Sequence, residues 1–266
     1  ADSLRVTSPS SPLASPPVSL LAPPPAMVTR GDLANLSIGI VLAALAYRAD
    51  ASVRREVQAT GWQQSGALST LADVGNGWGQ PGVVGLGIVM WGGGLYTRNA
   101  TVATVGLRAL EAITVGSTVT KILKGTIGRA RPRVSPGDPW DVEFGRGFGS
   151  STGDYEAMPS GLSTAAFAFA AAVTSEVARR APRRARLVGV TTFGLATATA
   201  YARMHRDAHW LSDVTMGAAI GMVSGWAVTR GHATRPGNRL DEILLGPVLR
   251  PARSGRTQIG VVLQWP

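Results

Sequence analysis

Apolar stretches with helical spacing recur along the chain from residue 32 to residue 229, and Gly, Pro and charged residues separate them. Apolar residues at every third or fourth position form one face of an α-helix. No internal repeat is evident, and the one strand-like pattern, residues 256–265, follows the helical block. We therefore expect an all-α fold, a bundle of about six core helices with one candidate C-terminal strand. The spacing predicts helices near residues 32–48, 81–96, 101–123, 161–179, 186–203 and 211–229.

The segment 101–123 illustrates the pattern. Its apolar and small residues recur at steps of three or four, which predicts one buried stripe formed by Val105, Ala109, Ala112, Gly116, Val119 and Leu123. Glycine is typical of a helix C-terminus. We therefore expect Gly125 to end this helix and to leave Lys124 at its C-terminal edge.

Proline and serine are concentrated in the first 30 residues, before the helical pattern begins. Such a composition favours an extended or disordered segment, and this one is typical of what remains after a signal peptide is removed. The sequence thus predicts three parts: an N-terminal segment (1–30), a helical domain (31–230) and a C-terminal extension (231–266).

The formal net charge of +10 indicates an anionic partner or a solvated basic surface. Aromatic residues make up 6% of the chain and are not interleaved with the arginines, which argues against a platform for single-stranded nucleic acid. We expect no nucleic-acid partner. The chain has no cysteine, which excludes disulfides and thiolate metal sites.

Crossing a membrane requires about 20 mostly apolar residues. The apolar runs here are shorter, Arg108 and Glu111 interrupt the third, and the mean hydropathy is only +0.13. These features favour a soluble or peripheral protein, periplasmic or secreted, that associates at most with a membrane surface. The alternative is an integral membrane protein with its site facing outward. An arginine cluster at residues 179–186 would then lie at the opposite helix ends from Ser160 and Arg203, as the positive-inside rule requires.

Two short segments could bind an anion. Lys124 and Arg131 both follow the apolar helix predicted at 101–123. The ammonium of lysine and the planar guanidinium of arginine both suit the oxygens of a phosphate. Pro159-Ser160-Gly161 opens another helix, where free backbone N–H groups and the helix dipole attract anions. Each segment alone also fits an ordinary explanation, solvated loop cations in one case and an N-cap serine in the other.

A third segment runs from Arg203 to Asp213 and contains His205 and His209, two of the three histidines in the chain. His209 and Asp213 are four residues apart and would share a helix face. A carboxylate there could hold one ring nitrogen and leave the other with its lone pair free, as in a catalytic triad. Arg203 would add a third cation.

In this order and spacing (K-x6-R-P, then P-S-G, then R-x5-H-x3-D), the three segments resemble the type 2 phosphatidic acid phosphatase superfamily. This superfamily includes bacterial acid phosphatases, lipid phosphatases and vanadium haloperoxidases. The resemblance covers about residues 32–230 and implies the helical fold of that group. It also implies that His209 is a nucleophile that forms a phosphohistidine and that Asp213 orients it. The phosphate-binding residues it implies are Lys124, Arg131, Ser160, Gly161 and Arg203.

The sequence departs from the family at Leu162, where the second motif normally has a histidine that donates a proton to the leaving alcohol. A leucine side chain cannot donate this proton, so we expect phosphate binding with impaired turnover. Asp207, Asp154 and Glu156 are weak candidates for a substitute acid. The leucine is either a deliberate replacement or the mark of a naturally degenerate site.

The resemblance predicts a phosphatase that acts on phosphate monoesters or lipid (di)phosphates, with a phosphorylated small molecule or a lipid phosphate as its partner. It requires neither a metal nor a cofactor, because the cations and the helix start supply the positive charge. Vanadate would bind as an inhibitor. The alternatives are a vanadium-dependent haloperoxidase, with vanadate as its cofactor, and a non-catalytic phosphate or phospholipid binder. The sequence predicts no oligomeric state.

Overall fold

The computed structural model describes residues 28–234 and 239–249. These residues form helices and loops. One isolated antiparallel β-bridge pairs Arg129 with Val142 in the loop after α5. The all-α prediction is therefore confirmed. The candidate strand at 256–265 and most of the N-terminal Pro/Ser-rich segment lie outside the described residues.

All six predicted helices are present. They are α1 (Arg30–Val57), α4 (Val83–Tyr96), α5 (Ala100–Ile127), α6 (Gly161–Arg180), α7 (Pro182–His205) and α8 (Leu211–Thr234). Shorter elements that the apolar pattern did not predict are α2 (Thr60–Gln63), α3 (Gly66–Gly77), a π-helical turn η1 (Trp78–Gly82), a 3-10 turn η2 (Arg146–Gly149), α9 (Arg239–Leu244) and α10 (Gly246–Leu249).

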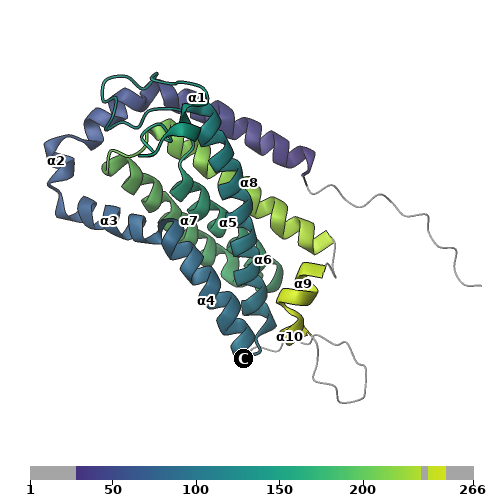
Figure 1. Ribbon diagram of the computed structural model, residues 1–266. Coiled ribbons are helices and arrows are strands. Elements are labelled where there is room, and N and C mark those ends of the chain that lie inside the picture. The colour runs from purple at the N-terminus through teal and green to yellow at the C-terminus, as the bar shows by residue number, and fades with distance from the viewer. Residues whose placement is uncertain (1–27, 235–238, 250–266) are drawn as a thin grey trace, which may run out of the picture.

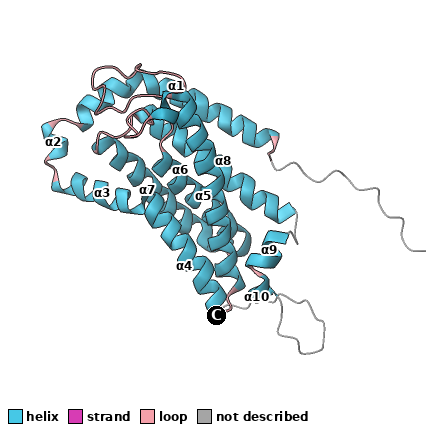
Figure 2. Cartoon of the chain, in the orientation of Figure 1, coloured by secondary structure: helices cyan, strands magenta, loops and turns pink. Residues whose placement is uncertain are grey.

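Helix α6 is the centre of the bundle. It packs against α5, α7 and α8, while α1 covers α8 and α4 covers α5 (Figure 1). The loops that carry the polar motifs gather at one end of the helices, next to the end of α1 (Figure 2). This arrangement brings the three motifs together although up to 89 sequence positions separate them (213 − 124).

Small residues explain the close approach of α6 and α8. Gly217, Gly221 and Gly225 recur every four residues on α8, and a Cβ atom at Gly221 would lie 2.4 Å from the carbonyl oxygen of Thr164. Small residues at this spacing allow two helix backbones to approach closely. At Gly217 the nearest atom is the carbonyl oxygen of Ser160, so this packing holds the start of α8 beside the start of α6.

The C-terminus of α5 differs from the prediction. Gly125 does not end the helix, which continues to Ile127 and ends at Gly128 with φ +62°. A Cβ atom at Gly128 would lie 1.9 Å from the carbonyl oxygen of Glu143, so both the backbone conformation and the space require glycine there. Gly125 instead makes room for the ring of Phe148.

The buried stripe of α5 also differs in its last turns. Val105, Ala109, Ala112 and Gly116 are buried as predicted, but Val119 is 41% exposed. The face that turns toward the bundle there carries Thr120 and Lys124. The buried face changes from apolar to polar because it becomes the wall of the functional site.

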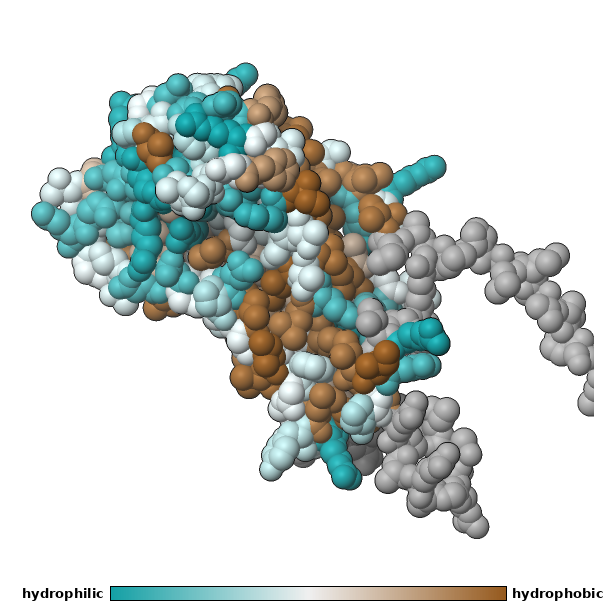
Figure 3. Space-filling view, viewed as in Figure 1, coloured by the Kyte–Doolittle hydropathy of each residue, from teal (hydrophilic) through white to brown (hydrophobic). Residues whose placement is uncertain are grey.

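The outer surface of the bundle is unusually apolar. Four helices in the described residues, α1, α5, α6 and α8, are long and apolar enough to cross a membrane. In α1 the residues Leu33, Ile38, Val41 and Leu45 are each more than half exposed. Hydrophobic side chains cover the sides of the helices, and hydrophilic ones gather at the loop end (Figure 3). This distribution fits the integral-membrane alternative, and the periplasmic or secreted location stays a prediction.

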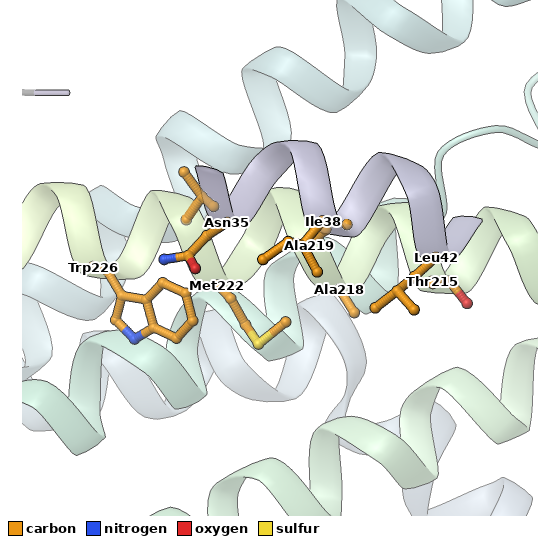
Figure 4. Close-up of a pocket in the computed structure, with 10 residues that line it drawn as sticks. Asn35, Ile38, Leu42, Thr215, Ala218, Ala219, Met222 and Trp226 are labelled. Carbon is orange, nitrogen blue, oxygen red and sulfur yellow. The ribbon is translucent and has the colours of Figure 1, made fainter. Parts of the chain in front are cut away.

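A shallow hollow of about 260 Å³ lies between α1 and α8 (Figure 4). Its lining carries no ionisable side chain, so it offers nothing to bind a phosphate. The residues that line it are Asn35, Ile38, Gly39, Leu42, Thr215, Ala218, Ala219, Met222, Val223 and Trp226.

Candidate phosphate site

A polar pocket of about 390 Å³ lies where the three motifs meet at the loop end of the bundle. It contains four of the five predicted phosphate-binding residues, together with His209 and Leu162. Its lining comes from η1, α5, the loop after α5, the start of α6 and the end of α7. The lining residues are Gln80, Ser117, Thr120, Lys121, Lys124, Arg131, Glu156, Gly161, Leu162, Arg203 and His209.

The first motif supplies two cations to the pocket. Lys124 lies in the last turn of α5, is 8% exposed, and donates a hydrogen bond to the carbonyl oxygen of Glu156. The guanidinium of Arg131 donates to the carbonyl oxygens of Gly153 (2.7 Å) and Ala208 (3.3 Å). These carbonyls orient both cations and leave their formal charges without a carboxylate partner at ion-pair distance within the described residues.

Arg203, at the end of α7, is the third cation. It donates a hydrogen bond of 2.8 Å to Oδ1 of Asn76 on α3, and its buried Nε has no partner among the described residues. Helix α3 packs closely against α7 at Gly75, the residue before Asn76. A Cβ atom at Gly75 would lie 2.1 Å from the carbonyl oxygen of Ala198. The apolar pattern did not predict α3, and Asn76 was therefore missed.

Ser160 and Gly161 form the start of α6, as the second motif predicts. Gly161 faces the pocket, and a Cβ atom there would lie 3.8 Å from Cε of Lys124. Ser160 is fully buried and lies outside the pocket lining. Its backbone N–H donates to the carbonyl oxygen of Asp213, and its hydroxyl accepts from Ser163. Gly161 is thus in direct reach of a ligand, and Ser160 ties the starts of α6 and α8 together.

His209 lies between α7 and α8 and is 4% exposed. Its Nδ1 is 2.7 Å from the carbonyl oxygen of Ala157 and 3.6 Å from Oδ2 of Asp213. A carbonyl oxygen can only accept, so Nδ1 carries the proton and Nε2 keeps its lone pair. Burial, followed by the charges of Lys124 and Arg131, lowers the pKa of His209 well below its usual value. The ring is therefore neutral at neutral pH.

Asp213 is held by Arg129, which the sequence did not single out. The Arg129 guanidinium is completely buried and donates to Oδ1 of Asp213 (2.6 Å), to Oγ of Ser212 (2.7 Å) and to Oδ2 of Asp50 on α1 (2.7 Å). The backbone N–H of Trp210 donates to the other oxygen of Asp213 at 2.8 Å. Both oxygens of Asp213 are thus engaged, which fixes the carboxylate beside His209.

The Arg129 guanidinium also lies over the ring of Tyr47, 4.1 Å from its centroid, and donates to the carbonyl oxygen of Pro139. These contacts join α1, the loop after α5 and α8 at one buried charge. The sequence signal that could have found Arg129 is its place two residues before Arg131. Its partner Asp50 had no such signal, because Asp50 lies 79 residues earlier in the sequence, on α1.

The three carboxyl groups considered as substitute proton donors lie in different environments. Asp207 accepts two hydrogen bonds of 2.7 Å from Arg54, and Asp154 pairs with Arg133. Glu156 lines the phosphate pocket and pairs with Lys121 at 3.0 Å. Each of the three carboxylates is thus already paired with a cation. Hydrogen bonds from Thr152 and Arg133 also lower the pKa of Asp154, which favours its ionised form over the protonated form that an acid needs.

No group of His, Asp or Glu in the described part of the chain is arranged to hold a metal ion. That the phosphatase chemistry needs no cofactor stays a prediction.

The fold and the pocket define an all-α protein with a neutral, buried histidine among three cations. Residues 105–236, which enclose all three motifs, match the family model described as the PAP2 superfamily. This match confirms the resemblance to the superfamily that the three motifs predict.

The fold is similar to a solved structure described as the first transmembrane PAP2 type phosphatidylglycerolphosphate phosphatase from Bacillus subtilis. The two chains are 18% identical, the match covers 76% of this chain and 96% of that chain, and the TM-score is 0.55. At this level of identity the match shows a shared fold. No curated protein matches the chain.

Proposed function

We propose that this protein is a lipid phosphatase that works through a phosphohistidine on His209. The observation that carries the proposal is the state of that ring. Its Nδ1 proton is engaged by the Ala157 carbonyl, and its pKa is lowered, so a neutral Nε2 faces a pocket with three cations. Phosphatase-type function also agrees with the match to the PAP2 superfamily.

The proposed reaction has two steps. In the first, the lone pair of Nε2 attacks phosphorus, a P–N bond forms, and the bond to the leaving oxygen breaks. Lys124, Arg131 and Arg203 stabilise the negative charge on the phosphoryl oxygens in the transition state. In the second step, water attacks phosphorus, the P–N bond breaks, and inorganic phosphate is released with the histidine restored.

Leu162 occupies the place from which the leaving oxygen would receive a proton. Its side chain packs against Gly79, where a Cβ atom would lie 2.8 Å from Cδ2 of Leu162. Loss of a general acid typically lowers the rate by about 10²–10⁴. The loss is largest for an alcohol leaving group, because an alkoxide is a strong base. Aryl phosphates and diphosphates release weaker bases and depend less on the acid.

The presence of a second hollow next to the phosphate pocket favours a lipid over a soluble molecule as the substrate. It measures about 470 Å³, lies between α4 and α5, and shares Gln80, Ser117 and Lys121 with the phosphate pocket. The remaining lining residues are Val84, Ile113, Thr114, Thr118 and Ile122. A hydrocarbon tail in this groove would leave the phosphate among the cations. Since α5 is apolar enough to cross a membrane, the groove would open toward lipid.

We further propose that the bundle is embedded in a membrane with the phosphate site at its outer face. The end of α6 and the start of α7, opposite the site, carry five arginines: Arg179, Arg180, Arg183, Arg184 and Arg186. Arginine clusters of this kind remain on the cytoplasmic side. The site would then act on lipid phosphates of the outer leaflet.

The test compares the protein with its Leu162→His variant on an aryl phosphate and on an alkyl phosphate. We expect the variant to gain about 10²–10⁴ in kcat/KM on the alkyl ester and clearly less on the aryl ester. His209→Asn in the same background serves as the inactive control. Equal gains on both esters would refute the proton-donor role, and no phosphate release from either would favour the non-catalytic binder.

A further inference from the structure

We propose that Gln80 and Ser117 form a subsite for the polar link between the phosphate and the hydrocarbon tail of the substrate. The subsite would select amphiphilic phosphates that carry acceptor oxygens within the first few atoms beyond the phosphate ester. This inference rests on the proposed function, because it concerns the substrate of the same pocket.

The position of the two residues carries the inference. Gln80, Ser117 and Lys121 line both the phosphate pocket and the groove between α4 and α5. A ligand with its phosphate among the cations and its tail in the groove must pass these three side chains. Lys121 is 73% exposed at its side chain and already paired with Glu156, so the amide and the hydroxyl remain as the neutral groups at this junction.

The hydroxyl of Ser117 is free to bind a ligand. Thr114, Thr118 and Thr126 on the same helix each donate their hydroxyl to the carbonyl oxygen four residues earlier. In contrast, Oγ of Ser117 is buried and has no hydrogen-bond partner within the described residues. Buried polar atoms are nearly always paired, so an orphan hydroxyl that lines a pocket indicates a missing ligand.

Gln80 is held at the junction by the local backbone. It lies in the π-helical turn η1, between Gly79 with the non-helical angles φ −47° and ψ −159° and Pro81. Short π-helical turns occur frequently at functional sites. Its amide has no side-chain hydrogen bond within the described residues, and it offers both donors and an acceptor to a ligand.

The chemistry of the two groups defines the ligand. A hydroxyl and an amide can donate to an ester carbonyl, an ether oxygen or the bridging region of a second phosphate. A simple alkyl phosphate presents only methylene groups at this point and gains nothing from them. The subsite would therefore favour glycerol-linked or diphosphate-linked lipids over alkyl phosphates with the same phosphate and a similar tail.

The test measures binding to the purified, detergent-solubilised chain, so that it does not depend on turnover. The ligands are dioctanoyl phosphatidate, farnesyl diphosphate, dodecyl phosphate and inorganic phosphate, and the variants are Ser117→Ala and Gln80→Leu. We expect each variant to weaken binding of one or both oxygen-linked ligands by about 3- to 10-fold, the loss of one hydrogen bond. Binding of dodecyl phosphate and inorganic phosphate should change less than about 2-fold.

The controls are Thr126→Ala, whose side chain lines neither hollow and whose hydroxyl donates to the Ile122 carbonyl, and the exposed Gln64→Leu. Both should leave all four affinities unchanged. Comparison of phosphatidate with farnesyl diphosphate shows which link the subsite prefers. Equal losses for all ligands, or no loss for either oxygen-linked ligand, would overturn the inference. Failure of the Leu162→His variant to release phosphate would refute the proposed function and leave this selectivity result intact.

Discussion

At the scale of single residues, the site depends on His209 being neutral in the midst of cations. Burial and the charges of Lys124 and Arg131 lower its pKa. A protonated ring would have no lone pair on Nε2 and could not attack phosphorus. In the proposed mechanism, the cations that would bind the phosphate thus also keep His209 in the form that can attack it.

The protonation midpoint of His209 in the ligand-free protein should therefore lie well below the usual pKa of histidine, about 6.5. The measurement is an NMR titration of ¹⁵N-histidine, which is practical because the chain has three histidines. His209→Asn assigns the signal. A protonation midpoint near 6.5 for that signal would contradict the electrostatic account.

Arg129 is the residue whose loss should be most damaging outside the pocket. Arg129→Ala would leave Asp50 and Asp213 buried without their cation, which typically destabilises a protein by about 3–5 kcal/mol. Arg133→Ala is the matched control, because its ion pair with Asp154 is exposed to solvent and should contribute little to stability. Thermal unfolding in detergent measures both. Similar melting temperatures for the two variants would show that the buried ion pairs of Arg129 do not stabilise the fold.

Sequence motifs predicted most of the charged residues that line the pocket but not those that position them. Lys124, Arg131, Gly161, Arg203 and His209 all line one pocket. Their supports, such as Asp50 and Asn76, lie on other helices, and single polar residues in apolar patterns carry no spacing signal. Only the three-dimensional structure brings them to the site.

At the scale of the elements, regular apolar spacing explains which helices were predicted. The six long helices carry it, whereas α3 is short and contains glycine and asparagine at its end. The error at Gly125 has a physical cause. Glycine is tolerated inside α5 because Phe148 fills the space, and the left-handed conformation that ends the helix comes three residues later.

The close packing of α6 and α8 should not tolerate a single methyl group. Gly221→Ala would place Cβ 2.4 Å from the Thr164 carbonyl, and overpacking of this kind typically costs about 1–3 kcal/mol. Gly194→Ala on α7 is the control, because a Cβ there has open space and alanine favours helix. We expect Gly221→Ala to lower the melting temperature and Gly194→Ala to keep or raise it. The opposite order would contradict the packing argument.

At the scale of the whole molecule, the apolar outer surface fits the integral-membrane alternative. Composition favoured a soluble or peripheral protein, because alanine, glycine and threonine dilute the mean hydropathy. The structure turns the small residues inward and leaves Leu, Ile and Val exposed on helices long enough to cross a membrane. Mean hydropathy cannot detect this, since it ignores the direction in which each side chain points.

Membrane orientation can be tested with introduced cysteines, because the chain has none. Trp140→Cys lies in an exposed loop at the site end, and Arg183→Cys lies in the first turn of α7, at the opposite end. We expect a membrane-impermeant maleimide to label the first variant in intact cells and the second only after lysis. Labelling of both in intact cells, or the reverse pattern, would exclude the proposed orientation.

In the proposed mechanism, His209 becomes phosphorylated while Lys124, Arg131 and Arg203 hold the phosphate. The most direct measurement is acid-free quenching of the protein during reaction with a ³²P-labelled aryl phosphate, followed by peptide mapping. Phosphohistidine is stable to alkali and labile to acid, which distinguishes it from a phosphoester. We predict label on the peptide that contains His209, and none in the His209→Asn variant. Label on another residue, or phosphate release with no labelled protein, would contradict the account.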